Sequence, residues 1–178
     1  MTTSTTTTQR LPLGRWHRLF YRGPSTEVLY NEYARQRRID DMAPITASFE
    51  VIIDAPVDRV WELLSRPKEW GDVDPAIRDV RLDGSVVEGA RFTWRNGRTR
   101  LTSRFAVVDA NRELTWIGAA LGAKVVHRHV MTPTEHGMTR LYSEESMAGP
   151  FLVLLFSSAK LHAALEQWLT AIKSAAQS

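Results

Sequence analysis

The chain has 178 residues, of which 43% are hydrophobic and 24% charged, as in a globular protein with room for one core. The absence of cysteine excludes disulfides, thiolate metal sites and cysteine nucleophiles, and it favours a cytoplasmic protein. The net charge of +3 arises in residues 1–45, because residues 46–178 are neutral, and a neutral body disfavours broad nucleic-acid binding.

Residues 1–45 are expected to form an N-terminal extension. Residues 1–10 are polar and predict a disordered tail without a signal peptide. Pro24 and Ser25 then predict the start of a helix that reaches about Ile39, with Ser25 as its N-cap. The basic, aromatic stretch between them, residues 11–23, leaves two interpretations open. It contacts a membrane surface or a partner, or it folds back on the main domain.

Residues 46–178 form the main domain and begin with a strand over 46–54. Residues 55–65 follow as an amphipathic helix, and residues 70–75 form a second, turn-rich segment after Pro67. Strand-like stretches separated by turn residues come next, and Asn96-Gly97 is the strongest hairpin signal among them. These stretches are 77–82, 91–95, 99–108, 113–119, 124–132 and 138–147.

The last predicted element is one long helix from Pro150 to about Ala176. Proline suits the first helical turn because its missing N–H would be unpaired there anyway. Apolar and polar residues at helical spacing predict one face that packs on the sheet: Phe151, Leu155, Ser158, His162, Leu165, Leu169 and Ile172. The fold class is therefore α+β, with an antiparallel meander and helices on one face. No apolar run is long enough to cross a bilayer.

Alternation within the strands predicts which side chains face the long helix. In the middle strands the arginines share one face, which we expect in water, and the aromatic and aliphatic residues share the other, including Val107. The same rule turns His127 and His129 inward, with Glu145 inward on the next strand. A buried carboxylate needs partners, and the imidazoles are the partners available in the sequence.

Four interpretations of this inward polar cluster stay open. It is a hydrogen-bonded network that supports the fold, or it fixes the polar groups of a ligand in an apolar pocket. In the third, His129 or His127 shuttles a proton while Glu145 orients it or acts as base. The fourth is a metal site, because His-x-His with a nearby acid is a ligand pattern. The acid that is close in sequence, Glu135, lies in a turn after a proline, so we predict no metal.

Three stretches of the sequence resemble a known family. They are VIIDAPVDRVWELLSRPKEW at 51–70, LTWIG at 114–118 and HRHVMTP…GMTRLYSEESMAG at 127–149, which leads into the last helix. They resemble the START-like (SRPBCC) polyketide cyclase/dehydrase and lipid-transport superfamily over about residues 46–176. The resemblance implies a helix-grip fold, in which a seven-stranded antiparallel sheet wraps around a long C-terminal helix, with two short helices after the first strand. It also implies a cavity between sheet and helix, and it maps Glu145 and Gly149 onto an acid–x–x–x–Gly pattern.

We therefore expect a protein that binds a hydrophobic, polyketide- or lipid-like small molecule in an internal cavity. The alternative is a polyketide cyclase or dehydratase that uses His129 and Glu145, with His127, for proton transfer. A third possibility is an interaction module that acts through the extension. No cofactor is expected, and a homodimer stays open. The predicted ligand-binding residues are Trp70, Phe92, Trp94, Ser103, Phe105, Trp116, Leu141, Met147, Leu155, Ser158 and His162.

Overall fold

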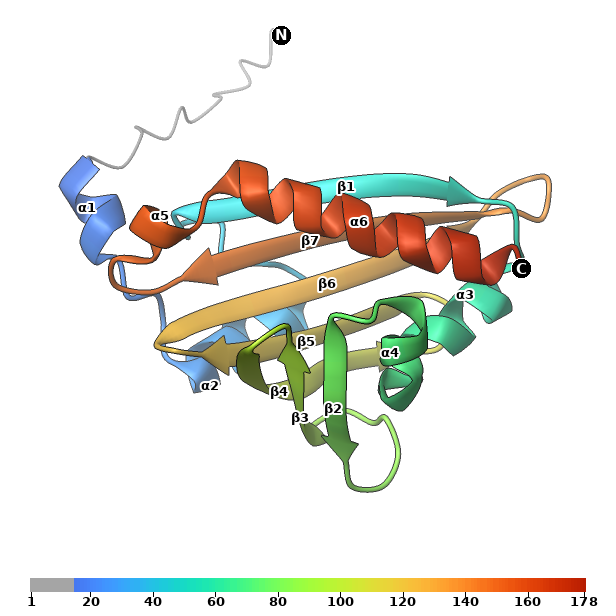
Figure 1. Cartoon of the computed structure of the whole chain (residues 1–178), viewed down its shortest axis with the longest axis horizontal. Coiled ribbons are helices and arrows are strands. Elements are labelled where there is room, and N and C mark those ends of the chain that lie inside the picture. Colours follow the sequence, from blue (N-terminus) through green and yellow to red (C-terminus); the bar gives the residue numbers. More distant parts are fainter. Residues whose placement is uncertain (1–14) are drawn as a thin grey trace, which may run out of the picture.

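The computed structural model describes residues 15–178 and contains a seven-stranded antiparallel sheet that curves around a long C-terminal helix (Figure 1). The strand order is β1-β7-β6-β5-β4-β3-β2, so the first strand lies beside the last and the others follow as a meander. The tail expected at residues 1–10 lies outside the described residues. The strands are β1 (Ile45–Ile53), β2 (Ile77–Leu82), β3 (Arg91–Asn96), β4 (Thr99–Asp109), β5 (Glu113–Ala120), β6 (Ala123–Pro133) and β7 (Thr139–Ala148).

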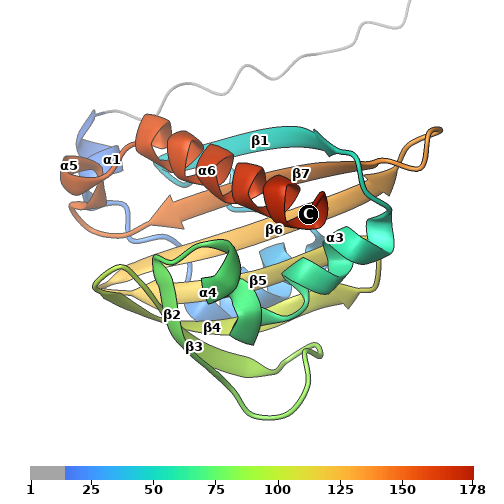
Figure 2. The same ribbon diagram turned by 45° about the vertical axis from the view of Figure 1, so that its right-hand side comes forward.

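The helices divide between the two faces of the sheet. After β1 come α3 (Val57–Leu64), the 3₁₀ turn η3 (Pro67–Glu69) and α4 (Trp70–Val73), and the chain ends with α5 (Leu152–Leu155) and α6 (Ser158–Ala176). Figure 2 shows α3, α4 and α6 together on one face, which we call the inner face. The extension contributes α1 (Arg15–Phe20), α2 (Thr26–Val28), the π-helical turn η1 (Leu29–Tyr33) and the 3₁₀ turn η2 (Ala34–Gln36).

The strand predictions are confirmed, with each boundary within one residue of the expected position. The predicted helix-grip fold, with two short helical segments after the first strand, is confirmed as well. The inner face carries the main hydrophobic core, where Phe92 and Phe105 stack at 4.4 Å beneath the helices. Burial of these large side chains is the main force that holds the sheet against α3 and α6.

The prediction of one unbroken helix from Pro150 is wrong. Phe156 and Ser157 have extended backbone, and they separate α5 from α6. The Ser157 hydroxyl accepts a hydrogen bond from the backbone N–H of Lys160 at 3.2 Å, so a serine N-cap starts a new helix there. Helical periodicity alone does not show such a break, because the apolar residues continue across it.

The break leaves Leu155 outside the helix face that packs on the sheet, whereas Leu165, Leu169 and Ile172 are buried on α6 as predicted. Leu155, predicted to face inward, is 76% exposed on α5, and His162 is exposed on α6. The Ser158 hydroxyl instead accepts a hydrogen bond from the backbone N–H of Thr46 at the edge of the sheet. The buried face of α6 consists of Leu161, Leu165, Leu169, Ile172 and Ala176.

A β-bulge in β4 corrects a second prediction. Phe105 lies opposite Trp116, but Val107 lies opposite Thr115, so one residue is added between these two pairs. Val107, which strict alternation places inward, therefore faces outward, and Val108 packs against the inner core instead.

The outer face of the sheet is not simply solvated, as its arginines led us to expect. The extension folds back over it, and Leu29, Tyr30 and Ala34 pack against sheet residues in a second hydrophobic cluster. The sheet contributes Ala106, Ile117 and Val126 to this cluster. Ser25 caps α2 as predicted, with its hydroxyl accepting from the Val28 N–H at 3.2 Å. The helix after it is irregular and ends at Arg37, which has a φ of 57°.

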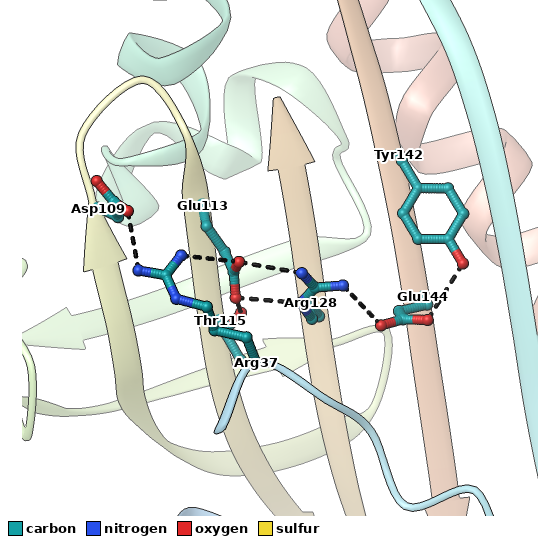
Figure 3. A network of polar contacts seen from close by, with 7 residues as sticks. All are labelled: Arg37, Asp109, Glu113, Thr115, Arg128, Tyr142 and Glu144. Atoms are coloured by element: carbon teal, nitrogen blue, oxygen red, sulfur yellow. Dashed lines mark hydrogen bonds and ion pairs between the residues drawn. The ribbon is translucent and has the colours of Figure 1, made fainter. Parts of the chain in front are cut away.

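A charged network joins this extension to the outer face (Figure 3). The carboxylate of Glu113, only 2% exposed, accepts hydrogen bonds from Arg37 at 3.1 Å and from Arg128 at 3.1 Å. Arg128 also binds Glu144 at 2.9 Å, and Arg37 binds Asp109 at 2.9 Å. Because a buried carboxylate is costly without partners, the two arginines explain how Glu113 is tolerated beneath the extension.

We predict that Leu29→Ala destabilises the whole domain, because Leu29 is 2% exposed where the extension meets the sheet. The expected loss is about 2–4 kcal/mol in the free energy of unfolding, measured by urea denaturation. The neighbouring Val28 is 42% exposed, so Val28→Ala is the matched control and is expected to change stability by less than about 0.5 kcal/mol. Equal effects of the two variants would show that the extension is not part of the cooperative unit.

Candidate functional site

A cavity of about 280 Å³ lies between the inner face of the sheet and α6. Most of its lining area is contributed by apolar side chains, with a small number of polar groups among them. The lining residues are Trp70, Asp74, Ala76, Ile77, Trp94, Asn96, Trp116, His127, His129, Glu145, Ala164, Leu165, Gln167 and Trp168.

Four tryptophans form the aromatic part of the lining, with Trp70 at their centre. Its ring centroid is 5.9 Å from Trp94, 5.3 Å from Trp116 and 5.9 Å from Trp168. The Trp70 indole N–H donates to the Leu64 carbonyl at 3.1 Å, and the Trp94 N–H donates to the Ser103 hydroxyl at 3.1 Å. These bonds hold two of the rings in place, and the mutual packing of all four makes the wall rigid.

His127 and Glu145 form a close polar contact on adjacent strands. The register of β6 and β7 places them directly opposite each other, and His127 Nδ1 lies 2.9 Å from a Glu145 carboxylate oxygen. In the imidazole tautomer that carries its hydrogen at Nδ1, facing the carboxylate oxygen, Nε2 of His127 keeps its lone pair. The imidazole also stacks on Trp116, with ring centroids 4.9 Å apart and planes at 22°.

His129 has a different environment, two residues along the same strand. It is 2% exposed, and its Nδ1 is hydrogen-bonded to the hydroxyl of Ser143 on β7. Burial, together with repulsion from His127, lowers the pKa of His129 from 6.5 to about 3, so this imidazole is neutral at physiological pH. In the tautomer in which the Ser143 hydroxyl donates to Nδ1, the imidazole N–H of His129 is at Nε2.

Three buried polar atoms of the cavity lining have no hydrogen-bond partner among residues 15–178. They are Nε2 of His127, Nε2 of His129 and the indole nitrogen of Trp116. Their chemistry is complementary, because the indole and His129 offer N–H donors and His127 offers a lone pair. Buried polar groups are normally paired, so three unpaired ones around one cavity need an explanation.

The structure brings together six of the residues that the sequence predicts for the site. Trp70, Trp94, Trp116, His127, His129 and Glu145 all line the cavity. The partner of Glu145 is His127, however, and not the expected His129, because the strand register places His129 opposite Ser143.

The other predicted residues lie outside the lining. Phe92, Ser103, Phe105 and Leu141 are fully buried, and Met147 is half-buried on β7 opposite Val125 and Ile45. Leu155, Ser158 and His162 also lie outside the lining. Leu155 is exposed on α5, the Ser158 hydroxyl binds the Thr46 N–H, and the His162 ring packs edge-on against Phe49.

Sequence reasoning missed the residues where the cavity meets α6 and the start of β2. Ala164, Gln167 and Trp168 lie on α6 outside the face that helical periodicity predicted to pack on the sheet. Asp74 comes from the loop before β2, where alternation gives no direction, and Asn96 is the last residue of β3, two residues after Trp94. The tryptophan count was a usable signal, because large aromatic residues tend to line ligand cavities.

Across residues 15–178, no three histidine or acidic side chains come together in a geometry suited to a metal ion. Over the same residues, no helix combines the length and apolar character needed to cross a bilayer.

Comparisons with solved structures show that the fold is shared widely. A hypothetical protein from Helicobacter pylori has 16% identity and a TM-score of 0.64, over 72% of this chain and 86% of that one. Norcoclaurine synthase from Thalictrum flavum has 17% identity and a TM-score of 0.58, over 72% of this chain and 91% of that one. A protein from Mesorhizobium loti has 21% identity and a TM-score of 0.58, over 73% and 95%. At these identities the likeness shows the fold alone.

Sequence comparisons give the family. No curated protein matches the chain significantly. The family model described as polyketide cyclase/dehydrase and lipid transport matches residues 44–177, which include all seven strands and α6. The chain therefore belongs to the polyketide cyclase/dehydrase and lipid-transport family.

Proposed function

We propose that the protein binds a small, mainly hydrophobic molecule, polyketide- or lipid-like, in the cavity between the sheet and α6. Membership of the family supports a ligand-binding protein. The observation that carries the proposal is the set of three unpaired polar atoms, on Trp116, His127 and His129, in a lining that is otherwise mostly aromatic and aliphatic. A ligand with one or two polar groups would pair these atoms while its apolar part contacts the tryptophans.

The same arrangement supports a second candidate function, in which the bound molecule undergoes proton transfer. The specific observation is the His127–Glu145 pair, because a carboxylate at Nδ1 orients the imidazole and leaves Nε2 facing the cavity as a proton acceptor. The substrate class would be a carbonyl compound with an acidic C–H next to the carbonyl. Nε2 of His127 takes that proton, the C–H electron pair becomes the C=C bond of an enolate, and the former C=O electrons move to oxygen.

In this reaction the unpaired atoms of Trp116 and His129 would contact the carbonyl oxygen of the substrate. Negative charge develops on the carbonyl oxygen, where preorganised N–H donors lower the barrier. Trp116 and neutral His129 supply two such donors, and their ring centroids are 4.9 Å apart. His129 is too weak a base for the proton transfer itself, because burial keeps its pKa at about 3. We therefore assign the base to His127 and the oxyanion contact to Trp116 and His129. The proton on His127 then returns to carbon or to a leaving oxygen.

Blocking the cavity should abolish ligand binding without unfolding the protein. Ala164 lines the cavity and is exposed on α6, so Ala164→Trp is expected to place an indole in the entrance. We expect this variant to lose at least about tenfold in affinity for the neutral fluorescent probe N-phenyl-1-naphthylamine. Ala163→Trp is the matched control, because Ala163 is the preceding exposed residue and lies outside the lining. Equal binding by both variants would place the ligand elsewhere.

Proton transfer can be tested by deuterium exchange into 2-tetralone, a small fused-ring ketone with acidic C–H bonds. His127→Gln is expected to slow protein-catalysed exchange by about 10²-fold or more, followed by proton NMR in D₂O. Glu145→Gln should slow it as well, whereas His162→Gln should not, since His162 is exposed outside the cavity.

The two candidate functions separate in this experiment. If the unmodified protein binds 2-tetralone but the C–H bonds of the ketone exchange no faster than in buffer, the proton-transfer function is contradicted and the ligand-binding function remains. If His127→Gln exchanges normally, another group is the base.

His129 should make the protein sensitive to acid. Its folded-state pKa of about 3 lies below the ordinary 6.5, so from pH 6.5 down to pH 3 the unfolded chain binds a proton that the folded chain does not. Lowering the pH therefore favours unfolding, by on the order of 2–3 kcal/mol at pH 4.5. We expect a shallower fall in Tm between pH 7 and pH 4.5 for His129→Gln than for the unmodified protein. His162→Gln should keep the original slope, and identical slopes for all three would refute the neutral, buried state of His129.

A further inference from the structure

The strongest unexplained feature outside the cavity is a row of arginines across the outer face of β2, β3 and β4. Arg78 lies directly opposite Arg95, and Arg95 lies directly opposite Arg100. Like charges at directly opposed positions destabilise a sheet, because their side chains project in parallel from neighbouring strands. Between Ile77 and Arg104 the chain has seven arginines, no lysine and three acidic residues, so the neutral body conceals one strongly basic edge.

A second arginine pair on the same strands has an acidic partner in the extension. Arg91 lies opposite Arg104, and Glu27 contacts both, at 4.0 Å and 3.4 Å. The guanidinium of Arg104 also lies 3.6 Å from the centroid of the Tyr30 ring. The extension therefore compensates part of the charge of this pair but does not reach the first row.

The first row has only one acidic neighbour in the described part of the chain. Asp79 binds Arg95 Nε at 3.1 Å from the irregular segment of β2, where its φ of 54° directs the chain away from regular pairing. Arg78 donates to the Gly97 carbonyl at 3.1 Å, and no carboxylate within residues 15–178 forms an ion pair with Arg78, Arg81 or Arg100. Four exposed arginines thus share one carboxylate.

These side chains border a small polar pocket of about 100 Å³. It is lined by Asp79, Arg81, Thr93, Trp94, Arg95 and Arg100. Arg81 lies opposite Thr93 on the next row, so a hydroxyl lies between the guanidinium groups. Guanidinium groups bind oxyanions through paired N–H donors, and the threonine adds one further donor.

We propose that this pocket is a binding site for a phosphate group, held by Arg81, Arg95 and Arg100 with Thr93. A doubly charged oxyanion would cancel the excess charge that Asp79 leaves among the three pocket arginines, Arg81, Arg95 and Arg100, and would relieve the repulsion along the row. The site lies on the opposite face of the sheet from the cavity, so it does not depend on the function proposed for the cavity. Nucleic acid is the less favoured source of the phosphate, because the basic surface is confined to one edge of an otherwise neutral body.

The first test is the effect of inorganic phosphate on the Tm of the full chain. We expect Tm to rise and to saturate as phosphate is added, while NaCl at equal ionic strength produces a smaller rise that does not saturate. A ³¹P NMR titration with the same protein should show a saturable shift. If NaCl matches phosphate at every ionic strength, only charge screening occurs and the proposal is overturned.

The second test uses variants. Loss of an arginine from the row should leave Tm unchanged or higher but weaken phosphate binding, whereas loss of a purely structural arginine would lower Tm. Without phosphate, Arg100→Gln removes a repulsion, so its Tm should stay level or rise. With phosphate, Arg100→Gln and Arg81→Gln should each weaken binding by at least about fivefold. Arg91→Gln is the matched control, because Arg91 belongs to the pair that Glu27 contacts and lies outside the pocket lining, and it should bind phosphate normally. Equal loss in Arg91→Gln would indicate a diffuse electrostatic effect and would overturn the site.

The source of the phosphate can be distinguished with vesicles. Binding of inorganic phosphate without binding to phosphatidic acid vesicles would support a site for soluble phosphate compounds. Binding to both, lost together in Arg100→Gln, would support a site that also accepts a lipid phosphate. Binding to phosphatidic acid vesicles alone, with no saturable effect of inorganic phosphate, would contradict the pocket and indicate a membrane-facing surface.

Discussion

The candidate site depends on the register of the sheet, which aligns one residue from each of four adjacent strands. Phe105, Trp116, His127 and Glu145 lie opposite one another in turn across β4, β5, β6 and β7. The row begins in the aromatic core, passes through an indole with a free N–H and ends in an imidazole paired with a carboxylate. A slip of one residue at any of these strand pairs would turn the indole, the imidazole or the carboxylate to the opposite face.

The two faces of the sheet handle charge differently. On the inner face the buried Glu145 has an imidazole partner, and the ring of Trp116 stacks on that imidazole. On the outer face the buried Glu113 has two arginine partners, one of which comes from the extension. The extension thus completes the ion pairs as well as covering apolar residues. The extension does not reach the first arginine row on β2 to β4, so these arginines keep an excess positive charge. They form a basic surface that the total charge of the chain does not reveal.

Much of the fold and part of the site could be predicted from local patterns. Period-two alternation placed Trp116, His127 and Glu145 on one face because the side-chain direction in a strand is set by the pleat. The same rule failed at Val107, where a bulge adds a residue, and in the helix before α6, where Ser157 starts a new N-cap. The bulge arises where β4 pairs with β5, and the sequence of one strand does not show the register of its partner. The Ser157 cap is a local bond to the Lys160 N–H, but the apolar periodicity continues across it and conceals the break.

The sequence by itself determined the strands, the inward direction of the two histidines and the family, because each depends on local geometry or on the order of motifs. Only the tertiary structure decided that Glu145 pairs with His127 and that His129 is neutral beside Ser143. Only the folded chain showed the extension on the outer face and the arginine row beyond it. These features depend on strand register and on burial, and both are set when distant segments pack together.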